Sequence, residues 1–439
     1  MHLFQSIAMP TPPAYYRAAT TCALLMCAAG SSANPQKSEP LPTEEYFAEY
    51  GSLYDHIGML QDHVRMGAYY DAIRLNAARH FRGKVVLDVG AGTGVLSIWA
   101  AQAGAKKVYA VEATGVAAHA KRMAKAHGFG DVITVLKGRM EELELPEKVD
   151  VLLSEWMGYF LLRESMVSSV LYARDKWLKP TTGVMYPSEA KLLLAPMSEK
   201  GFVDARAAEV SGSMVTWDQL TESLSGRYKL NLNALREEYL DENVEYSFRN
   251  AWQGALPRHA AVGEPATLLD VDMHTVTSEE LFGWSREITL PPTDGLFPAG
   301  GQIDDNHFDT PVHMLCGWFD VRFCAGGGME GDGSSTSSGR EEGKCVELST
   351  GPYSPYTHWA HTSFVLDPPM IGRRLTVGLT QNTKSHHDLN VTLSYDEGGE
   401  LNANAHYFIT AEFKTEDRGS NGQHELGDEE EDGEEEEQE

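Results

Sequence analysis

The hydrophobic and polar positions follow one repeat in the first half of the chain and another in the second. Over residues 84–186, apolar runs such as "KVVLDVG", "KVYAVEA" and "VDVLLSE" alternate with stretches that carry apolar residues at helical spacing. Strands that alternate with amphipathic helices predict a doubly wound parallel sheet, an α/β fold. Before them, residues 44–83 repeat aromatic, acidic and apolar positions at helical spacing, which predicts N-terminal helices.

β-branched and aromatic runs dominate from about Pro187 onward, where Gly, Pro and Asp separate segments such as "HMLCGWFDVRF" and "RLTVGLTQN". This pattern predicts an antiparallel β-barrel or sandwich over residues 187–418. Within it, residues 202–240 return to helical spacing, and we expect them to project from the sheet as an inserted arm.

Three segments have compositions that do not support a packed core. Residues 1–43 are rich in Ala, Pro, Ser and Thr and contain no acidic residue before Glu39, so we expect a disordered leader, with a targeting segment as the alternative. Residues 325–344 are rich in Gly and Ser and predict a flexible insert. Residues 419–439 predict a disordered acidic tail.

The charge balance is strongly acidic, since 36 basic residues face 64 acidic ones and the formal net charge is −28. We expect no direct nucleic-acid binding, which requires Lys and Arg at phosphates, and we expect attraction of basic partners. No apolar run reaches the length of a transmembrane helix, so we expect no membrane association. Five cysteines without framework spacing indicate a reducing compartment, the cytoplasm or nucleus, with Cys316 and Cys324 as core thiols.

A glycine-rich turn follows Asp88 and joins the first predicted strand to its helix in "VVLDVGAGTGVLSIWA". Its glycines are Gly90, Gly92 and Gly94, and we expect the Asp88 carboxylate before them to bind a cationic or hydroxyl-bearing cofactor. Glycine lets a ligand approach the backbone, and the spacing differs from both the dinucleotide fingerprint and the phosphate loop. Glu112 at the next strand end is placed for ribose hydroxyls, and Glu141 for an adenine. S-adenosylmethionine, which is cationic and carries no phosphate, fits this set; the alternative is a set of turn glycines in a cofactor-free domain.

Two carboxylates frame a bulky apolar stretch in "SEWMGYFLLRE", with Glu155 at the end of the fourth predicted strand and Glu164 opening the next helix. A solvated loop acid and a first-turn glutamate would explain each residue alone. Together in an aromatic pocket they form a receptor for guanidinium, a planar fork of donors. Drawing the guanidinium charge toward one nitrogen leaves another able to attack the sulfonium methyl group. The surrounding residues lack the spacing of a metal site, and we expect no metal.

These motifs closely resemble those of the protein arginine N-methyltransferases. The resemblance runs from about Tyr46 to residue 413 and is carried by "YFAEY", "VVLDVGAGTG", "SEWMGYFLLRESM", "LYARDKWLKP" and "YTHWAHTSF". The arm "WDQLTESLSGRYKLNLNAL" looks most like that of plant-type members of the asymmetric-dimethylating (type I) class. The resemblance implies a Rossmann-like methyltransferase domain, a β-barrel domain and a helical dimerisation arm that forms a head-to-tail homodimer.

The resemblance also implies roles for residues that spacing alone does not single out. Tyr46, Phe47 and Tyr50 would lie on an N-terminal helix that closes over the cofactor, with Tyr50 reaching the substrate pocket. Arg65 would pair with the methionine carboxylate of the cofactor and help to orient Glu164. The three glycines would pass beside the cofactor.

Near the substrate, the resemblance implies that His358 pairs with Asp62 beside the pocket and that Trp359 forms a wall of the arginine site. It places the junction of the two domains at Tyr186 and Pro187, often a cis peptide.

The predicted activity is methyl transfer from S-adenosylmethionine to peptidyl arginine, giving ω-N-monomethyl and asymmetric dimethylarginine. Met59 and Met166 match positions of the type I class that leave space for a second methyl group. Arg/Gly-rich or histone-like basic proteins are the expected substrates, and either Glu164 or the His358–Asp62 pair could accept the proton. The alternatives are a methyltransferase with a small-molecule or lysine substrate, and a scaffold that binds cofactor or basic proteins.

Overall fold

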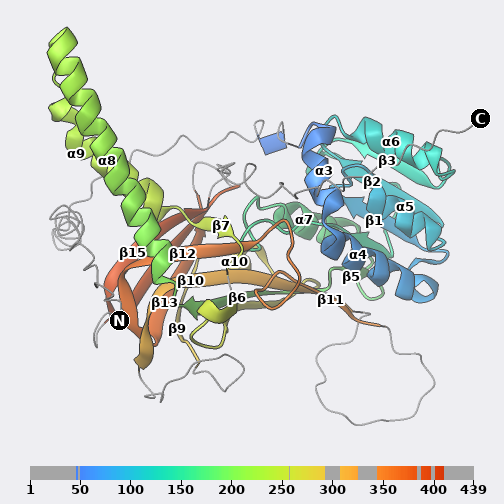
Figure 1. Cartoon of the computed structure of the whole chain (residues 1–439). Coiled ribbons are helices and arrows are strands. Elements are labelled where there is room, and N and C mark those ends of the chain that lie inside the picture. Colours follow the sequence, from blue (N-terminus) through green and yellow to red (C-terminus); the bar gives the residue numbers. More distant parts are fainter. Residues whose placement is uncertain are drawn as a thin grey trace, which may run out of the picture.

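A computed structural model gives the fold (Figure 1). It describes residues 46–47, 50–256, 258–291, 307–324, 344–382, 387–396 and 401–409. The expectations for the leader (1–43), for the acidic tail (419–439) and, apart from residue 344, for the insert (325–344) lie outside the described residues.

From Leu53 onward, the described part of residues 44–83 forms two helices and a π-helical turn, as the helical spacing predicts. They are α3 (Leu53–Gln61), α4 (His63–Leu75) and η1 (Ala77–Phe81). Asp62 separates α3 from α4 and accepts a hydrogen bond at 2.9 Å from the backbone N–H of Arg65. This N-cap satisfies a free donor of α4, and it places the Asp62 carboxylate at the start of the helix.

Residues 84–186 form a five-stranded parallel sheet in the order β3-β2-β1-β4-β5. Its strands are β1 (Val85–Val89), β2 (Lys107–Glu112), β3 (Ile133–Lys137), β4 (Val151–Leu153) and β5 (Val184–Tyr186). Helices α5 (Val95–Gln102), α6 (Ala117–Ala126) and α7 (Val167–Trp177) and the turn η2 (Met140–Glu142) connect them. All of β1 is buried, as expected for a sheet covered on both faces. The strand order reverses between β1 and β4, which opens a crevice at the carboxyl ends of the strands.

The second half of the chain is antiparallel and forms two sheets, with strand orders β7-β12-β10-β6-β8 and β15-β14-β13-β9; β11 pairs with β10. The first sheet contains β6 (Glu189–Met197), β7 (Trp252–Gly254), β8 (Ala266–Asp272), β10 (His307–Phe323), β11 (Val346–Ser349) and β12 (His361–Gly372). The second contains β9 (Trp284–Thr289), β13 (Arg374–Gln381), β14 (Leu389–Asp396) and β15 (Leu401–Ile409). Two short helices, η5 (Arg258–Ala260) and α10 (Ser278–Leu281), lie between strands. The predicted fold class, an α/β domain followed by an antiparallel β-barrel domain, is confirmed.

A helical arm projects from the β domain (Figure 1). It consists of α8 (Lys200–Tyr228), η3 (Leu232–Leu235), α9 (Arg236–Val244) and η4 (Glu245–Arg249), and so extends further than the predicted 202–240. The rings of Trp217 and Tyr239 stack at 4.3 Å and hold α9 against α8. Arg236 adds an ion pair to Asp218 at 3.1 Å.

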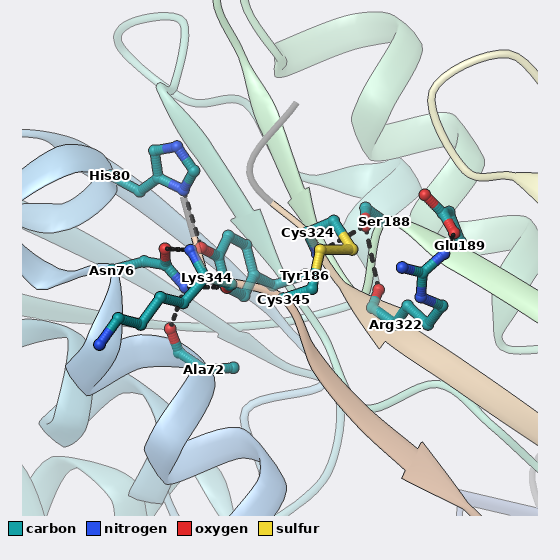
Figure 2. The surroundings of a disulfide bond; sticks show 10 residues. All are labelled: Ala72, Asn76, His80, Tyr186, Ser188, Glu189, Arg322, Cys324, Lys344 and Cys345. Carbon is teal, nitrogen blue, oxygen red and sulfur yellow. Dashed lines mark hydrogen bonds and ion pairs between the residues drawn. A yellow bond between two sulfur atoms is a disulfide. The ribbon is translucent and has the colours of Figure 1, made fainter. Parts of the chain in front are cut away.

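The two domains share one hydrophobic core cluster and meet at Tyr186–Pro187, whose peptide bond is cis. The Tyr186 hydroxyl lies 2.7 Å from Nδ1 of His80 on η1. Close to this junction a disulfide joins Cys324 to Cys345 (Figure 2). Cys324 is therefore not a core thiol, whereas Cys316 is a buried free cysteine as predicted.

The disulfide closes the predicted insert at its base, since the two cysteines lie 21 residues apart in sequence. Beside it, Asn76 at the end of α4 hydrogen-bonds the carbonyl oxygen and the N–H of Lys344, at 3.0 and 3.2 Å (Figure 2). The cytoplasmic or nuclear location stays a prediction.

Candidate active site

A cavity of about 1040 Å³ lies at the carboxyl ends of the parallel strands, beside the glycine-rich turn that follows β1. Its walls come from five further parts of the chain: the N-terminal region, the ends of β2 and η2, the loop between β4 and α7, the turn before β12, and the end of β13 with the loop that follows it. Sequence-predicted residues that line it are Tyr46, Phe47, Tyr50, Met59, Arg65, Gly90, Gly92, Glu112, Glu141, Glu155, Glu164, Met166, His358 and Trp359.

Two glycines of the turn have a backbone conformation that disfavours a side chain, and both lie close to another wall of the cavity. Gly90 has φ +72° and Gly92 has φ +53°, the left-handed region that favours glycine. A Cβ at Gly90 would lie 2.1 Å from Cε of Met166, and one at Gly92 would lie 3.1 Å from Cε1 of His56. The turn therefore presents bare backbone to the cavity.

Gly94 and Asp88, which we expect at the cofactor, do not line the cavity. Gly94, at φ +85°, caps α5, and a Cβ there would lie 3.2 Å from that of Ala120 on α6. Asp88 is 0% exposed and accepts a hydrogen bond from Ser97 Oγ at 2.6 Å. Burial raises the pKa of Asp88 to about 7. Both residues support the turn from beneath.

Two carboxylates mark the side of the cavity next to β2 and η2. Glu112 accepts hydrogen bonds from the backbone N–H groups of Gly92 and Thr114, each at 2.8 Å, so its carboxylate is fixed across the turn. Glu141 accepts from the Ser169 hydroxyl at 2.5 Å. The carboxylates of Glu112 and Glu141 accept hydrogen bonds, so they suit hydroxyl and amino donors rather than phosphate. These residues fit a phosphate-free nucleoside such as S-adenosylmethionine.

Glu155 lies two residues beyond β4 and is fixed by an arginine. Nε and Nη2 of Arg65 lie 3.0 and 2.9 Å from Glu155 Oε2, and Arg65 Nη1 donates to the Met59 carbonyl oxygen at 2.8 Å. The expectation that Arg65 orients Glu164 is therefore wrong. Arg65 lies on the first turn of α4 and pairs with the acid that follows β4 instead.

Glu164 is held by tyrosine hydroxyls. Its Oε2 accepts from Tyr50 at 2.7 Å and from Tyr46 at 3.2 Å, while Nη1 of Arg163 lies 3.4 Å from Oε1. Burial raises the pKa of Glu164; the nearby Glu155 charge adds to this rise, and Arg163 and the hydroxyls oppose it. Glu164 does not open a helix as expected, because its φ is +80° and α7 begins only at Val167.

His358 and Trp359 line the cavity from the turn before β12. Nδ1 and the backbone N–H of His358 lie 2.7 and 2.9 Å from Asp62 Oδ2, which joins the barrel to the cap of α4. Burial alone would raise the pKa of Asp62, but hydrogen bonds from His358 and from the Arg65 N–H hold this pKa below its ordinary value. Trp359 is 3% exposed, and its Nε1–H donates to the Met157 carbonyl oxygen at 2.9 Å.

Comparison with known proteins identifies both domains that contribute to this site. Residues 86–181 match the methyltransferase domain model, and residues 202–400 match the arginine methyltransferase oligomerization subdomain. The chain is 40% identical over 357 residues to protein arginine N-methyltransferase PRMT10 of Oryza sativa subsp. japonica, covering 80% of this chain and 87% of the relative. The chain belongs to the protein arginine N-methyltransferase family. Its activity is methyl transfer from S-adenosylmethionine to protein arginine, as predicted.

Further comparisons confirm the resemblance of this methyltransferase to plant members. PRMT10 of Arabidopsis thaliana is 38% identical over 353 residues, covering 79% of this chain and 84% of the relative. The crystal structure of Arabidopsis thaliana protein arginine methyltransferase 10, in an open conformation, aligns with a TM-score of 0.71 and 35% identity over 83% of this chain and all of that one. The Trypanosoma brucei PRMT1 enzyme–prozyme complex with AdoHcy aligns with a TM-score of 0.63 and 31% identity, over 82% and 99% of the two chains.

Sequence reasoning missed two histidines of this methyltransferase site. His56 lines the cavity against Gly92, and its Nε2 lies 3.2 Å from the Tyr50 carbonyl oxygen. Its position three residues before Met59 in α3 was an available signal, because residues three apart share a helix face. His387 lines the cavity from the loop between β13 and β14, and no motif of the sequence marks it.

Within the described part of the chain, no helix has the length and apolar character needed to span a membrane. The same residues contain no group of three His, Cys, Asp or Glu side chains placed to hold a metal ion.

Proposed function

We propose that Glu155 and Glu164 together grip the guanidinium group of the substrate arginine. One observation supports this assignment: both carboxylates line the cavity beside the glycine turn, yet different partners fix them. A guanidinium presents donors in a planar fork, which two carboxylates can bind from two sides. Trp359 and Met157 supply apolar walls that exclude water from the bound cation.

We also assign cofactor-binding roles to residues that line the same cavity. We assign Glu112 to the ribose hydroxyls of S-adenosylmethionine, Glu141 to its adenine, and Tyr46 and Phe47 to the cover above it. When bound, S-adenosylmethionine supplies a methyl group on a sulfonium sulfur, which needs no further activation. The contact of Arg65 with the methionine carboxylate is part of this proposal, since Arg65 lines the cavity while holding Glu155.

The arginine nitrogen that accepts the methyl group forms a C–N bond and gives up one proton. The C–S bond breaks, and its electrons remain on sulfur. We assign the proton to Glu164, because its raised pKa makes it a stronger base than an exposed glutamate. The His358–Asp62 pair is the second candidate, since His358 also lines the cavity.

Substitution of the paired acids tests this assignment. Glu155→Gln and Glu164→Gln should each reduce kcat/KM by about 30- to 1000-fold, the range for losing one partner of a buried charge-assisted contact. Glu287→Gln, at an exposed position of β9, is the control and should leave activity unchanged. Calorimetric binding of S-adenosylhomocysteine should persist in all three variants. Near-normal turnover in both acid variants would contradict the proposed role.

We propose that the product is asymmetric dimethylarginine. Met59 and Met166 both line the cavity, and the close approach of Met166 Cε to Gly90 places a flexible thioether beside the glycine turn. Hydrolysis of methylated protein and separation of the dimethylarginine isomers tests this; a symmetric product would overturn it.

We propose a head-to-tail homodimer, built on the oligomerization subdomain that the family model identifies. The arm exposes Leu220, Tyr228 and Leu230, and α3 at the cofactor domain exposes Leu53 and Tyr54. Exposed apolar surfaces of this kind are typical of protein interfaces. Light scattering should give twice the chain mass of 48.4 kDa, and Tyr54→Asp should shift the particle toward the monomer. A wild-type monomer at micromolar concentration would refute the dimer.

We propose Arg/Gly-rich or histone-like basic proteins as substrates, on the basis of the formal net charge of −28. Opposite charge accelerates encounter, and salt screens it. The association rate of a basic peptide should therefore fall as ionic strength rises. A rate that does not respond to salt would contradict electrostatic steering.

A further inference from the structure

His387 contacts the backbone of Glu164 although the two lie 223 residues apart in sequence. The N–H of Glu164 donates to the His387 carbonyl oxygen at 2.6 Å, and ring Nδ1 of His387 lies 2.8 Å from the Glu164 carbonyl oxygen. Because a carbonyl oxygen only accepts, Nδ1 carries the proton in this contact. The two bonds therefore tie Glu164 to His387 from both of its backbone groups.

This tie acts on a backbone that would not keep its conformation unaided. Glu164 and Ser165 have φ values of +80° and +55°, which side chains other than glycine rarely adopt. Such residues persist when surrounding contacts over-determine them. Here a second contact comes from the end of β13, just before the loop that carries His387, since Gln381 Nε2 donates to the Ser165 hydroxyl at 2.8 Å.

The imidazole ring of His387 also packs on a residue that holds the Glu164 carboxylate. Its ring stacks on that of Tyr46 with centroids 3.9 Å apart and planes 11° apart. Tyr46 in turn donates its hydroxyl to Glu164 Oε2. One side chain thus touches both the main chain of Glu164 and the tyrosine at its carboxylate.

We propose that His387 is a positioning residue for methyl transfer, with two separable functions. Its ring N–H fixes the backbone of Glu164, and its ring face seats Tyr46 over the cofactor. The inference depends on the proposed role of Glu164 at the guanidinium and of Tyr46 over the cofactor. It makes His387 the point at which the barrel domain contributes to both binding sites.

Three substitutions separate the two functions. His387→Phe keeps a ring that can stack on Tyr46 but removes the N–H donor. His387→Asn keeps an N–H donor in the place of Nδ1 but removes the ring. His387→Ala removes both, while the carbonyl oxygen that accepts from Glu164 is retained in every variant. His406→Ala, at an exposed position of β15, is the matched control.

The variants should affect kcat and the KM of S-adenosylmethionine separately. His387→Phe should lower kcat by about three- to tenfold with KM within about twofold, as expected for one lost hydrogen bond. His387→Asn should recover most of kcat but raise KM, and the Kd of S-adenosylhomocysteine, by about three- to tenfold, as expected for one lost aromatic contact. His387→Ala should show both changes, and His406→Ala neither.

Two results would overturn this role. In the first, all three His387 variants retain the wild-type kcat and KM. In the second, kcat and KM change together in proportion to a lowered melting temperature, without rescue of kcat by Asn. Glu164→Gln, measured in parallel, separates the causes of failure: an active Glu164→Gln refutes the proposed function of Glu164, whereas an inactive one beside normal His387 variants refutes only the role of His387.

Discussion

Replacing Arg65 by Met distinguishes the partner that the structure gives this arginine from the partner expected from sequence. Nε and Nη2 of Arg65 both reach Oε2 of Glu155, and the two side chains are only 13% and 11% exposed. None of the hydrogen bonds or ion pairs that Arg65 makes with described residues reaches Glu164. Methionine preserves an unbranched apolar stem of similar length and removes the guanidinium alone.

The size of the effect follows from the burial of this ion pair. Removing one partner of a fully buried pair costs about 3–5 kcal/mol, and an exposed pair is worth less than about 1 kcal/mol. Arg65 and Glu155 retain some contact with solvent, so we expect about 2–3 kcal/mol, a loss of about 30- to 150-fold in kcat/KM. The loss should arise because Glu155 no longer keeps a fixed orientation toward the guanidinium.

A double-mutant cycle with labelled S-adenosylmethionine and an arginine-rich peptide measures this coupling. Once Glu155→Gln has removed the charge that Arg65 holds, Arg65→Met should reduce kcat/KM for the peptide by no more than about threefold further, a coupling of at least about 1.4–2.3 kcal/mol. On a Glu164→Gln background, by contrast, Arg65→Met should reduce kcat/KM by the same factor as in the wild type, so that the losses of the two single variants multiply. Multiplied losses with Glu155→Gln, together with coupled losses with Glu164→Gln, would refute the pairing in the structure.

Three further predictions follow from the site and the disulfide. Tyr50→Phe removes a 2.7 Å bond to Glu164 and should lower kcat by about 10-fold while melting temperature stays constant; unchanged kcat would contradict it. Because burial raises the pKa of Glu164 and the charged form is required, the rate should fall with decreasing pH at a midpoint above that of an exposed glutamate, and Glu164→Gln should lack this limb of the pH profile. Cys324→Ser with Cys345→Ser opens a 21-residue loop and should lower the free energy of unfolding by about 3 kcal/mol in urea titrations; equal midpoints for the variant and the non-reduced wild type would contradict it.

The fold could be predicted where the pattern of apolar residues in the sequence matches the side of the strand or helix that is buried. The continuous apolar run of β1 reads as a strand because both faces of the sheet are covered. The change of pattern near Pro187 likewise corresponds to the change from parallel to antiparallel pairing. The disulfide escaped prediction because pairing depends on the distance between two strand ends, which cysteine spacing does not encode.

The residues of the candidate site could be predicted, but the contacts among them could not. The acids, glycines and His358 stand in recognisable motifs, and the cavity brings most of them together. Arg65 was paired with the wrong acid because the motifs do not encode which of the two acids lies next to the first turn of α4. His387 escaped notice because its contacts exist only after the barrel has folded against the α/β domain.

The charges of the two glutamates are compensated to different extents, and this difference explains how one cavity can bind two cations. An ion pair with Arg65 offsets the charge of Glu155, while uncharged hydroxyls from Tyr46 and Tyr50 hold Glu164 and leave its charge largely uncompensated. The more distant Arg163, at 3.4 Å, compensates Glu164 only in part, since Asp388 lies 3.9 Å from the same guanidinium. A bound guanidinium would therefore be drawn toward Glu164, and the nitrogen that faces the cofactor would lose positive charge. Tyrosines suit this function because they fix the position of a carboxylate without neutralising it.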